Sequence, residues 1–296
     1  MTFGVRDGAL VEHARQGSWN LRELRQPGVA RKTWAARRGI ALPRLPHAPV
    51  VEGRVWAVTM VRDEEDIIAA TIEHLLDQGV DHVLVADNRS VDRTADILAE
   101  LAASDPRIHL AVDREPAYFQ AEKMTRLVQA AGRAGAAWVI PFDADEFWFA
   151  EGCTLKEFFT RLGRQSPPVG VVRAQFLHMV PEQPHPADLR AATFVMDSHP
   201  SEPGKVAVRG HRWARVTVGN HFGVRVGERS DGLFIAHALY RGPAQVARKV
   251  RQGTEAVMLT RPGDEIAPHW RASTAQLPSW LCRFSCAWLK CGGRPN

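Results

Sequence analysis

Cysteine and long apolar runs are scarce in this chain of 296 residues. Only four cysteines occur and none forms a Cys-x-x-Cys pair, which argues against a disulfide framework and against a zinc ribbon. No apolar run approaches the roughly 18 residues that span a membrane, and the first residues contain no signal-peptide core. We therefore expect the cytoplasm as the compartment, and a peripheral contact at the inner membrane face stays open.

The composition is that of a folded protein with a locally basic start. Hydrophobic residues make up 45% and charged residues 24%, which is ordinary globular usage. The net charge is +5, and residues 1–50 hold nine Arg and Lys against three acids. Such an arm can meet anionic lipid or nucleic acid, but we favour a solvated helical lead-in. No aromatic interleaving supports a nucleic-acid partner.

Apolar and amphipathic segments alternate along most of the chain. Residues 1–50 are expected to form a helical arm and a Pro-punctuated linker, and 261–296 a C-terminal extension with Cys282, Cys286 and Cys291 on one helix face. Between them, strands are predicted at 55–61, 80–87, 108–112 and 136–142, separated by helices at 66–79, 94–104 and 120–134. This order predicts right-handed βαβ units and a largely parallel sheet. Shorter strands follow after about residue 152, which indicates an irregular second lobe.

Acidic clusters follow three of the predicted strands. The segments are RDEED, DNRSVD and DADEF. Each alone has an ordinary explanation, because Asp, Asn and Ser are favoured at turns and helix N-caps. Parallel strands end at one edge, however, and ligands of such sheets bind beyond that edge. The three clusters together therefore predict a binding site.

The last cluster has the chemistry of a metal site. In an extended chain Asp143 and Asp145 share a face, with Ala144 directed away. Carboxylate oxygens without nearby cysteine suit Mg²⁺ or Mn²⁺ better than zinc. Such an ion keeps open positions that phosphate oxygens commonly fill. The pattern predicts a site for a metal and a diphosphate.

The succession VTMVRDEEDIIAATIEHLLDQGVDHVLVADNRSVDRT, DADEF and IAHALYRGPAQVARKVRQG resembles glycosyltransferases of the GT-A fold, family 2 type. The framing of DADEFW and IAHALYR is similar to the family 92-like branch. The resemblance covers about residues 54–255. It implies an α/β fold with a mostly parallel central sheet flanked by helices, a nucleotide-binding half at 51–150, and an irregular acceptor half at 151–260.

The resemblance also implies roles for individual residues. Contacts to the nucleotide or diphosphate are expected from Val61, Arg62, Glu64, Asp87, Asp143 and Lys249. Mn²⁺ or Mg²⁺ is expected on Asp143, Asp145 and His237. Asp145 and Glu146 are the catalytic candidates, with a purely structural role for Glu146 left open. Arg62 and Asp63 depart from the Lys-Asn-Glu common in related enzymes.

The expected activity is metal-dependent, inverting transfer from a nucleotide diphosphate sugar, with UDP expected, to a hydroxyl of a saccharide, glycolipid or small molecule. A haloacid dehalogenase-like phosphatase fits poorly, because Phe147 stands where its motif has Thr or Val. A sugar nucleotidyltransferase needs a Gly-rich phosphate loop, which RDEED does not supply. A non-catalytic carbohydrate-binding or scaffold protein with a GT-A domain stays as the alternative.

Overall fold

The chain divides into two compact units, which are described separately. The computed structural model describes residues 3–182 and 192–260, and the predicted terminal helix with its three cysteines lies outside them. The larger unit comprises Met1–Glu115 and Phe119–Arg241. The basic arm therefore belongs to the same unit as the predicted nucleotide-binding half. The second unit comprises Pro116–Tyr118 and the described residues from Gly242 onward.

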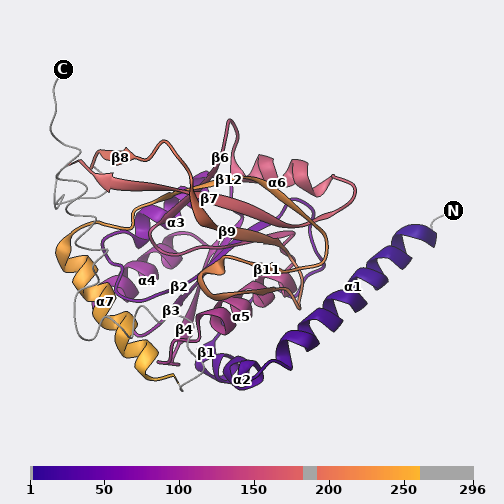
Figure 1. Cartoon of the computed structure of the whole chain (residues 1–296), viewed down its shortest axis with the longest axis horizontal. Coiled ribbons are helices and arrows are strands. Elements are labelled where there is room, and N and C mark those ends of the chain that lie inside the picture. The colour runs from indigo at the N-terminus through magenta and orange to yellow at the C-terminus, as the bar shows by residue number, and fades with distance from the viewer. Residues whose placement is uncertain (1–2, 183–191, 261–296) are drawn as a thin grey trace. The chain divides into compact units, whose positions relative to one another are not determined.

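Four parallel strands form the centre of the larger unit (Figure 1). Their order across the sheet is β4 (Ile108–Asp113), β3 (His82–Asp87), β2 (Val55–Val61) and β5 (Trp138–Pro141). All of β2 except Met60 is buried, as expected for a strand covered on both faces. Val61 pairs with Asp87 in register, so these two strands end together.

The strands predicted in the second half extend this same sheet. They follow β5 in the order β9 (Ser201–Arg209), β7 (Val169–Pro181), β12 (Glu228–His237) and β6 (Glu146–Ala150). β9 is antiparallel to β5 and β7, β7 is parallel to β12, and β6 is antiparallel to β12. Short strands complete the unit: β1 (Ile40–Ala41) on β4, β8 (Phe194–Met196) on β7, and a separate pair of β10 (Arg215–Val216) with β11 (Gly223–Val224), joined through η1 (Val218–Asn220).

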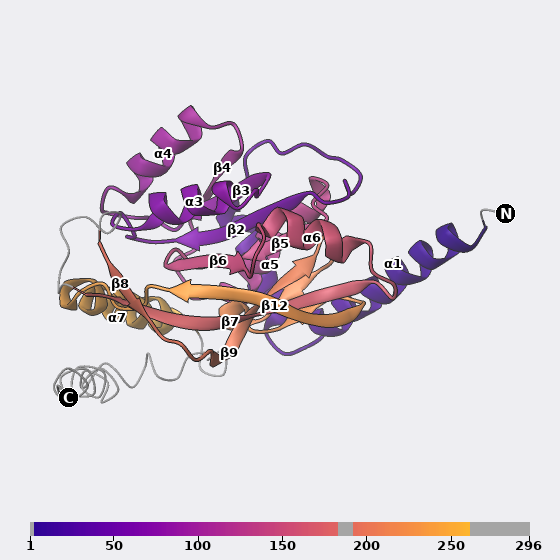
Figure 2. The same ribbon diagram turned by 90° about the horizontal axis from the view of Figure 1, so that it is seen from above.

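Helices cover both faces of the central sheet, as the alternating pattern predicts (Figure 2). One core cluster joins Val55 and Ala57 to α3 (Ile68–Asp77), α4 (Thr94–Ser104) and α6 (Leu155–Gly163). The other joins Trp56 and Val58 to α5 (Gln120–Arg133). Alternate β2 side chains thus enter opposite cores. The predicted α/β class with a parallel centre is confirmed.

The basic arm contains two helices, α1 (Phe3–Leu24) and α2 (Val29–Gly39), and α1 packs on the rest of the larger unit. The buried Gln16 amide donates to the carbonyls of Trp213 at 3.0 Å and Val224 at 2.9 Å. It also accepts from the Val226 amide at 2.9 Å. At Gly17 a β-carbon would lie 2.8 Å from the Trp213 ring, so glycine permits this close approach.

The second unit contains α7 (Pro243–Met258), which begins with proline in its first turn. The Tyr118 amide donates to the Ala256 carbonyl at 3.0 Å and ties the short segment 116–118 to this helix. Across the described residues of both units, no helix is long and apolar enough to cross a membrane.

Candidate active site

Hydrogen bonds link the loops that follow β2 and β3. The Asp63 carboxylate is buried and accepts from the Val91 amide at 2.6 Å. The Asp63 amide donates to Ser90 Oγ at 3.0 Å, and the Glu64 amide donates to Thr94 Oγ1 at 2.8 Å. Asp63 has a positive φ of 55°, a conformation that Asp tolerates better than most residues. Asp63 thus holds the two loops together.

A buried charge pair lies at the same edge of the sheet, where β4 ends. Asp113 and Lys123 are both buried, and their Oδ2 and Nζ atoms lie 2.8 Å apart. Burial raises the pKa of Asp113 and lowers the pKa of Lys123, against the mutual attraction of the pair. Asn88 Nδ2 donates to the same Asp113 oxygen at 2.8 Å. The loop after β3 is therefore fixed to the end of β4.

Asp87 ends β3 beside these fixed loops. Its Oδ2 accepts from the Ser90 amide at 3.3 Å. Its Oδ1 is buried and has no hydrogen-bond partner within the described part of the chain. Buried acceptors are normally paired, so this oxygen is suited to bind a donor group of a ligand.

The acidic segment after β5 is a turn rather than an extended chain. The Glu146 amide donates to the Asp143 carbonyl at 3.1 Å and closes the turn. Thr71 Oγ1 donates to the Ala144 carbonyl at 2.5 Å from α3. The expectation that Asp143 and Asp145 share one face of an extended chain is therefore wrong. Asp143 is 40% exposed at its side chain and Asp145 only 1%, so the two carboxylates have different surroundings.

Lys205 joins Asp143 to Glu146 in the interior. Its Nζ lies 2.5 Å from Asp143 Oδ2 and 2.6 Å from Glu146 Oε1. Burial alone would lower the pKa of Lys205, but the two carboxylates outweigh it and raise that pKa. Burial raises the pKa of Glu146 to about 7 against the opposing effect of Lys205. Sequence reasoning missed Lys205, although a lysine within the apolar run KVAV was a visible signal.

Glu146 is enclosed by further contacts. Its Oε2 accepts from the Asp143 amide at 3.0 Å and from Trp148 Nε1 at 3.3 Å. The residue has 0% exposed surface, so its carboxylate cannot touch an acceptor in this conformation. Through these contacts the Glu146 carboxylate orients Asp143 and Lys205. A catalytic role for Glu146 stays a prediction that would require its exposure.

Asp145 lies between His237 and Arg241. Its Oδ1 is 3.7 Å from His237 Nε2, and its Oδ2 is 3.5 Å from Arg241 Nη1. The Ala238 amide donates to the Asp145 carbonyl at 2.9 Å, which holds the end of β12 against the acidic turn. His237 also pairs in register with Glu146 across β12 and β6. The structure therefore brings two of the predicted metal ligands together from opposite halves of the chain.

Arg241 was not singled out in the sequence, yet it ties the first loop to this site. Its Nη2 lies 2.5 Å from Glu64 Oε2 and its Nε lies 2.7 Å from Asp66 Oδ2. Burial would lower the pKa of Arg241, but Glu64, Asp66 and Asp145 together raise it. The Glu64 side chain, predicted to contact the nucleotide, is thus held by Arg241. Val61 is buried in the core, and Arg62 Nε lies 3.9 Å from Asp63.

The donor atoms at this edge fit a divalent ion on two side chains. Two atoms that each bind one ion at about 2.1 Å lie at most about 4.2 Å apart. The 3.7 Å between Asp145 Oδ1 and His237 Nε2 satisfies this limit. In the described residues no three His, Cys, Asp or Glu side chains form a metal-binding group, so the predicted set with Asp143 is not assembled. Asp143 instead pairs with Lys205.

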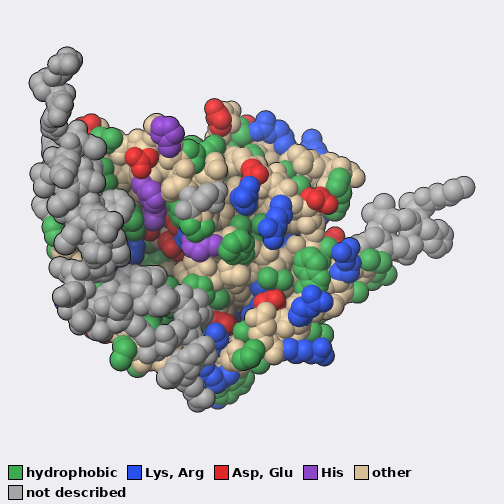
Figure 3. Space-filling model, in the orientation of Figure 1, with side chains coloured by type: hydrophobic (Ala, Val, Ile, Leu, Met, Phe, Trp, Pro, Cys, Tyr) green, Lys and Arg blue, Asp and Glu red, His purple; other side chains and the backbone are tan. Residues whose placement is uncertain are grey.

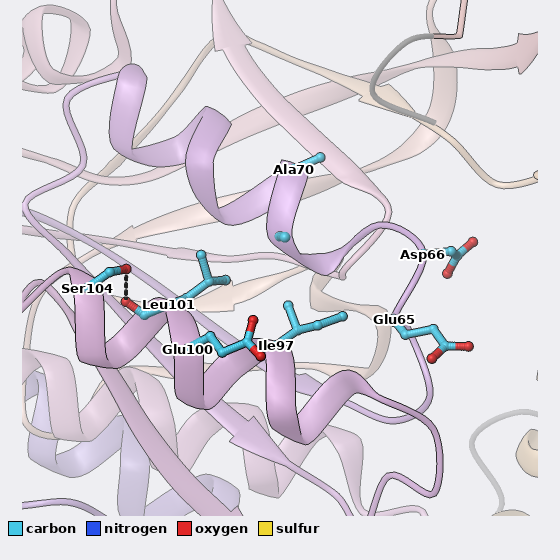
Figure 4. Close-up of a pocket in the computed structure, with 8 residues that line it drawn as sticks. Glu65, Asp66, Ala70, Ile97, Glu100, Leu101 and Ser104 are labelled. Carbon is cyan, nitrogen blue, oxygen red and sulfur yellow. Dashed lines mark hydrogen bonds between the residues drawn. The ribbon is translucent and has the colours of Figure 1, made fainter. Parts of the chain in front are cut away.

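Two further features concern residues outside the acidic turn. Lys249 is on α7 in the second unit, and its predicted diphosphate contact stays a prediction. A cavity of 540 Å³ lies between α3 and α4 (Figure 4), with Glu65 and Asp66 at one end. The other residues that line it are Ala69, Ala70, Ile97, Glu100, Leu101 and Ser104. None of the predicted site residues lines this cavity, so we do not assign the donor to it.

Comparison with solved structures gives low similarity. A mannosyltransferase, PcManGT, from Pyrobaculum calidifontis in complex with GDP-Man and Mn²⁺ shares 21% identity, with a TM-score of 0.33, over 56% of this chain and 46% of that chain. HddC from Yersinia pseudotuberculosis shares 12% identity, with a TM-score of 0.36, over 65% of this chain and 96% of that chain. This chain thus spans less than half of the first protein. TM-scores this low support no inference about activity.

A family model gives the informative match. No curated protein matches this chain. Residues 56–192 match the model for Glycosyl transferase family 2, and this stretch runs from β2 through the acidic turn to the end of β7 and beyond. The match includes Asp63, Asp87, Asp143 and Asp145, but not Lys205, His237 or Arg241. The match covers less than half of this chain, and together with the α/β architecture it agrees with the predicted GT-A fold class and supports glycosyl transfer as the activity to be tested.

Proposed function

We propose that this protein is a metal-dependent, inverting glycosyltransferase that uses a nucleotide diphosphate sugar, with UDP as the expected nucleotide. The observation that carries the proposal is the pair of Asp145 and His237, whose facing atoms lie 3.7 Å apart at the edge where the parallel strands end. This edge is where α/β sheets bind their ligands. The acceptor is a hydroxyl of a saccharide, a glycolipid or a small molecule.

The nucleotide is bound by the loops after β2 and β3. The buried Oδ1 of Asp87 is suited to accept a hydrogen bond from the base or the ribose. Arg62 and the backbone of residues 61–64 belong to the loop after β2. Asp63 keeps this loop in place by accepting a hydrogen bond from the Val91 amide. Because Glu64 is held by Arg241, its contribution to binding comes from loop position rather than from a free carboxylate.

In this proposal the diphosphate and the metal bind at the acidic turn. Asp145 and His237 would hold Mn²⁺ or Mg²⁺, with Asp143 turned toward Lys205 and the ribose side. A bound ion would neutralise the charge that develops on the leaving diphosphate. Lys205 and Glu146 keep Asp143 in one orientation, so that little reorganisation accompanies the reaction.

The experiment is a transfer assay with a panel of UDP-, GDP- and ADP-linked sugars, with and without Mn²⁺, followed by NMR of the product anomer. Asp145→Ala should lose metal-dependent transfer by at least a hundredfold, while Asp77→Ala on the exposed side of α3 should retain it. An active Asp145→Ala enzyme would refute the metal assignment. Retention of the donor anomeric configuration would refute inversion. Saccharide binding without turnover for every donor would favour the scaffold alternative.

A further inference from the structure

The outward side of α1 has exposed apolar residues beside exposed arginines. Leu10 is 69%, Val11 57% and Leu21 56% exposed. Arg15, Arg22 and Arg25 are exposed as well, the last just beyond the helix end. We call these six residues the N-terminal basic surface. Lys and Arg side chains also gather over α1 and α2 at the lower right of Figure 3.

Helical geometry turns part of this surface away from the side of α1 that packs on the protein. Gln16 and Gly17 face Trp213, and Asn20 Oδ1 accepts from Arg215 Nη1 at 3.4 Å. At 100° per residue Val11, Arg15 and Arg22 fall opposite these positions, and Leu10 and Leu21 lie at the border of the two sides, next to Gly17. Figure 1 shows α1 running away from the sheet toward its N-terminus. On this side and at its border, Leu10, Val11, Leu21, Arg15 and Arg22 are exposed.

Helix α1 contains three acids, Asp7, Glu12 and Glu23, and only Asp7 falls on the outward side by its position along the helix, against Arg15 and Arg22. Glu12 forms an ion pair with Arg225 of the protein body. Glu23 accepts from Gln26 Nε2 at 2.9 Å. Positive charge therefore dominates the outward side. The following helix continues the same chemistry, because Trp34 is 60% exposed and the Arg38 guanidinium lies 4.7 Å from its ring.

We propose that the N-terminal basic surface binds an anionic lipid membrane. A helix with apolar residues beside arginines lies in the plane of the lipid interface, where both kinds of side chain are satisfied. Tryptophan is enriched at the same depth, as Trp34 would be. Nucleic acid would use the arginines but would leave Leu10, Val11 and Leu21 exposed to water. The proposal is independent of the proposed donor and metal, and its test measures binding alone.

The test is co-sedimentation of the full chain with vesicles of phosphatidylcholine alone or with a quarter phosphatidylglycerol. Each arginine near an anionic surface contributes about 1 kcal/mol, which is about fivefold in affinity. Arg15→Glu with Arg22→Glu should therefore weaken binding to the anionic vesicles by about 30-fold or more. The matched control reverses Arg164 and Arg229, two exposed arginines elsewhere on the larger unit, and should change binding less than about threefold.

The apolar contribution is tested at high salt, where screening weakens the charge term. Leu10→Ser with Leu21→Ser should weaken the remaining binding roughly tenfold, and Val112→Ser with Val195→Ser, at exposed sites away from α1, should not. Circular dichroism checks that each variant is folded. Vesicle binding of the unaltered protein at increasing salt tests the charge contribution without any variant. Equal binding to neutral and anionic vesicles would overturn the proposal. So would equal losses in the control pairs, or binding to an RNA oligomer that displaces the vesicles.

Discussion

Removal of the Lys205 ammonium should destabilise the protein strongly. Lys205→Met keeps the length of the side chain but leaves the Glu146 carboxylate without its cation. The lysine side chain is 3% exposed and the glutamate 0%, so water cannot replace the lost partner. Breaking a buried pair by removing one member costs about 3–5 kcal/mol. In a protein of this size the melting temperature should fall on the order of 10 °C.

A surface pair of the same length provides the control. Lys156 Nζ lies 2.5 Å from Asp81 Oδ2, but the two side chains are 35% and 32% exposed. Lys156→Met should therefore cost less than about 1 kcal/mol. Urea denaturation of both variants measures the difference. Equal costs for the two lysines would refute the reasoning from burial.

A double-mutant cycle separates the pair from the loss of packing. Glu146→Gln alone leaves Lys205 paired with Asp143, and it should be destabilising. The combination of Lys205→Met and Glu146→Gln buries no uncompensated charge. It should be more stable than the sum of the single effects predicts, by about 1–3 kcal/mol. Additive effects would show that Lys205 and Glu146 are not energetically coupled.

Three further predictions concern the contacts around this core. Gln16→Ala should cost about 2–3 kcal/mol in urea denaturation, because it leaves buried backbone groups unpaired, whereas the exposed Gln26→Ala should cost almost nothing. Arg241→Gln should cost about 3–5 kcal/mol and weaken donor binding in calorimetry, with Arg229→Gln as the unaffected control. Burial and then Arg225 lower the pKa of His211 from 6.5 to about 4, so folding excludes its proton. The free energy of unfolding should therefore fall as the pH drops from 6.5 toward 4, and that of the His211→Gln variant should fall less over the same range. Parallel curves of unfolding free energy against pH for the two proteins would contradict this.

The sequence predicted the parts of the site that depend on strand ends. Continuous apolar runs made β2, β3 and β5 recognisable, and parallel strands end at one edge whatever packs around them. Asp63, Asp87 and the acidic segment after Pro141 were therefore expected to gather before any contact was known. The match of residues 56–192 to a glycosyltransferase family covers this same region.

Side-chain partners at the site could not be read from the chain. Lys205 comes from β9 and Arg241 from the loop after β12, and each meets carboxylates more than 50 residues away in sequence. Local pattern carries no information about such pairs, because their formation depends on which strands become neighbours in the sheet. The expected extended chain at Asp143 is likewise a turn in the structure. Its Ala144 carbonyl accepts a hydrogen bond from Thr71 of α3, a contact between distant segments.

The sequence by itself determined the α/β class, the parallel centre and the edge at which the acidic residues lie, because these follow from periodicity and from the direction of each strand. Only the tertiary structure decided how the three carboxylates differ. Asp143 and Glu146 share the buried Lys205, whereas Asp145 faces His237 and Arg241. Burial and the choice of cation, which arise from packing between distant segments, set the surroundings and the orientation of each carboxylate.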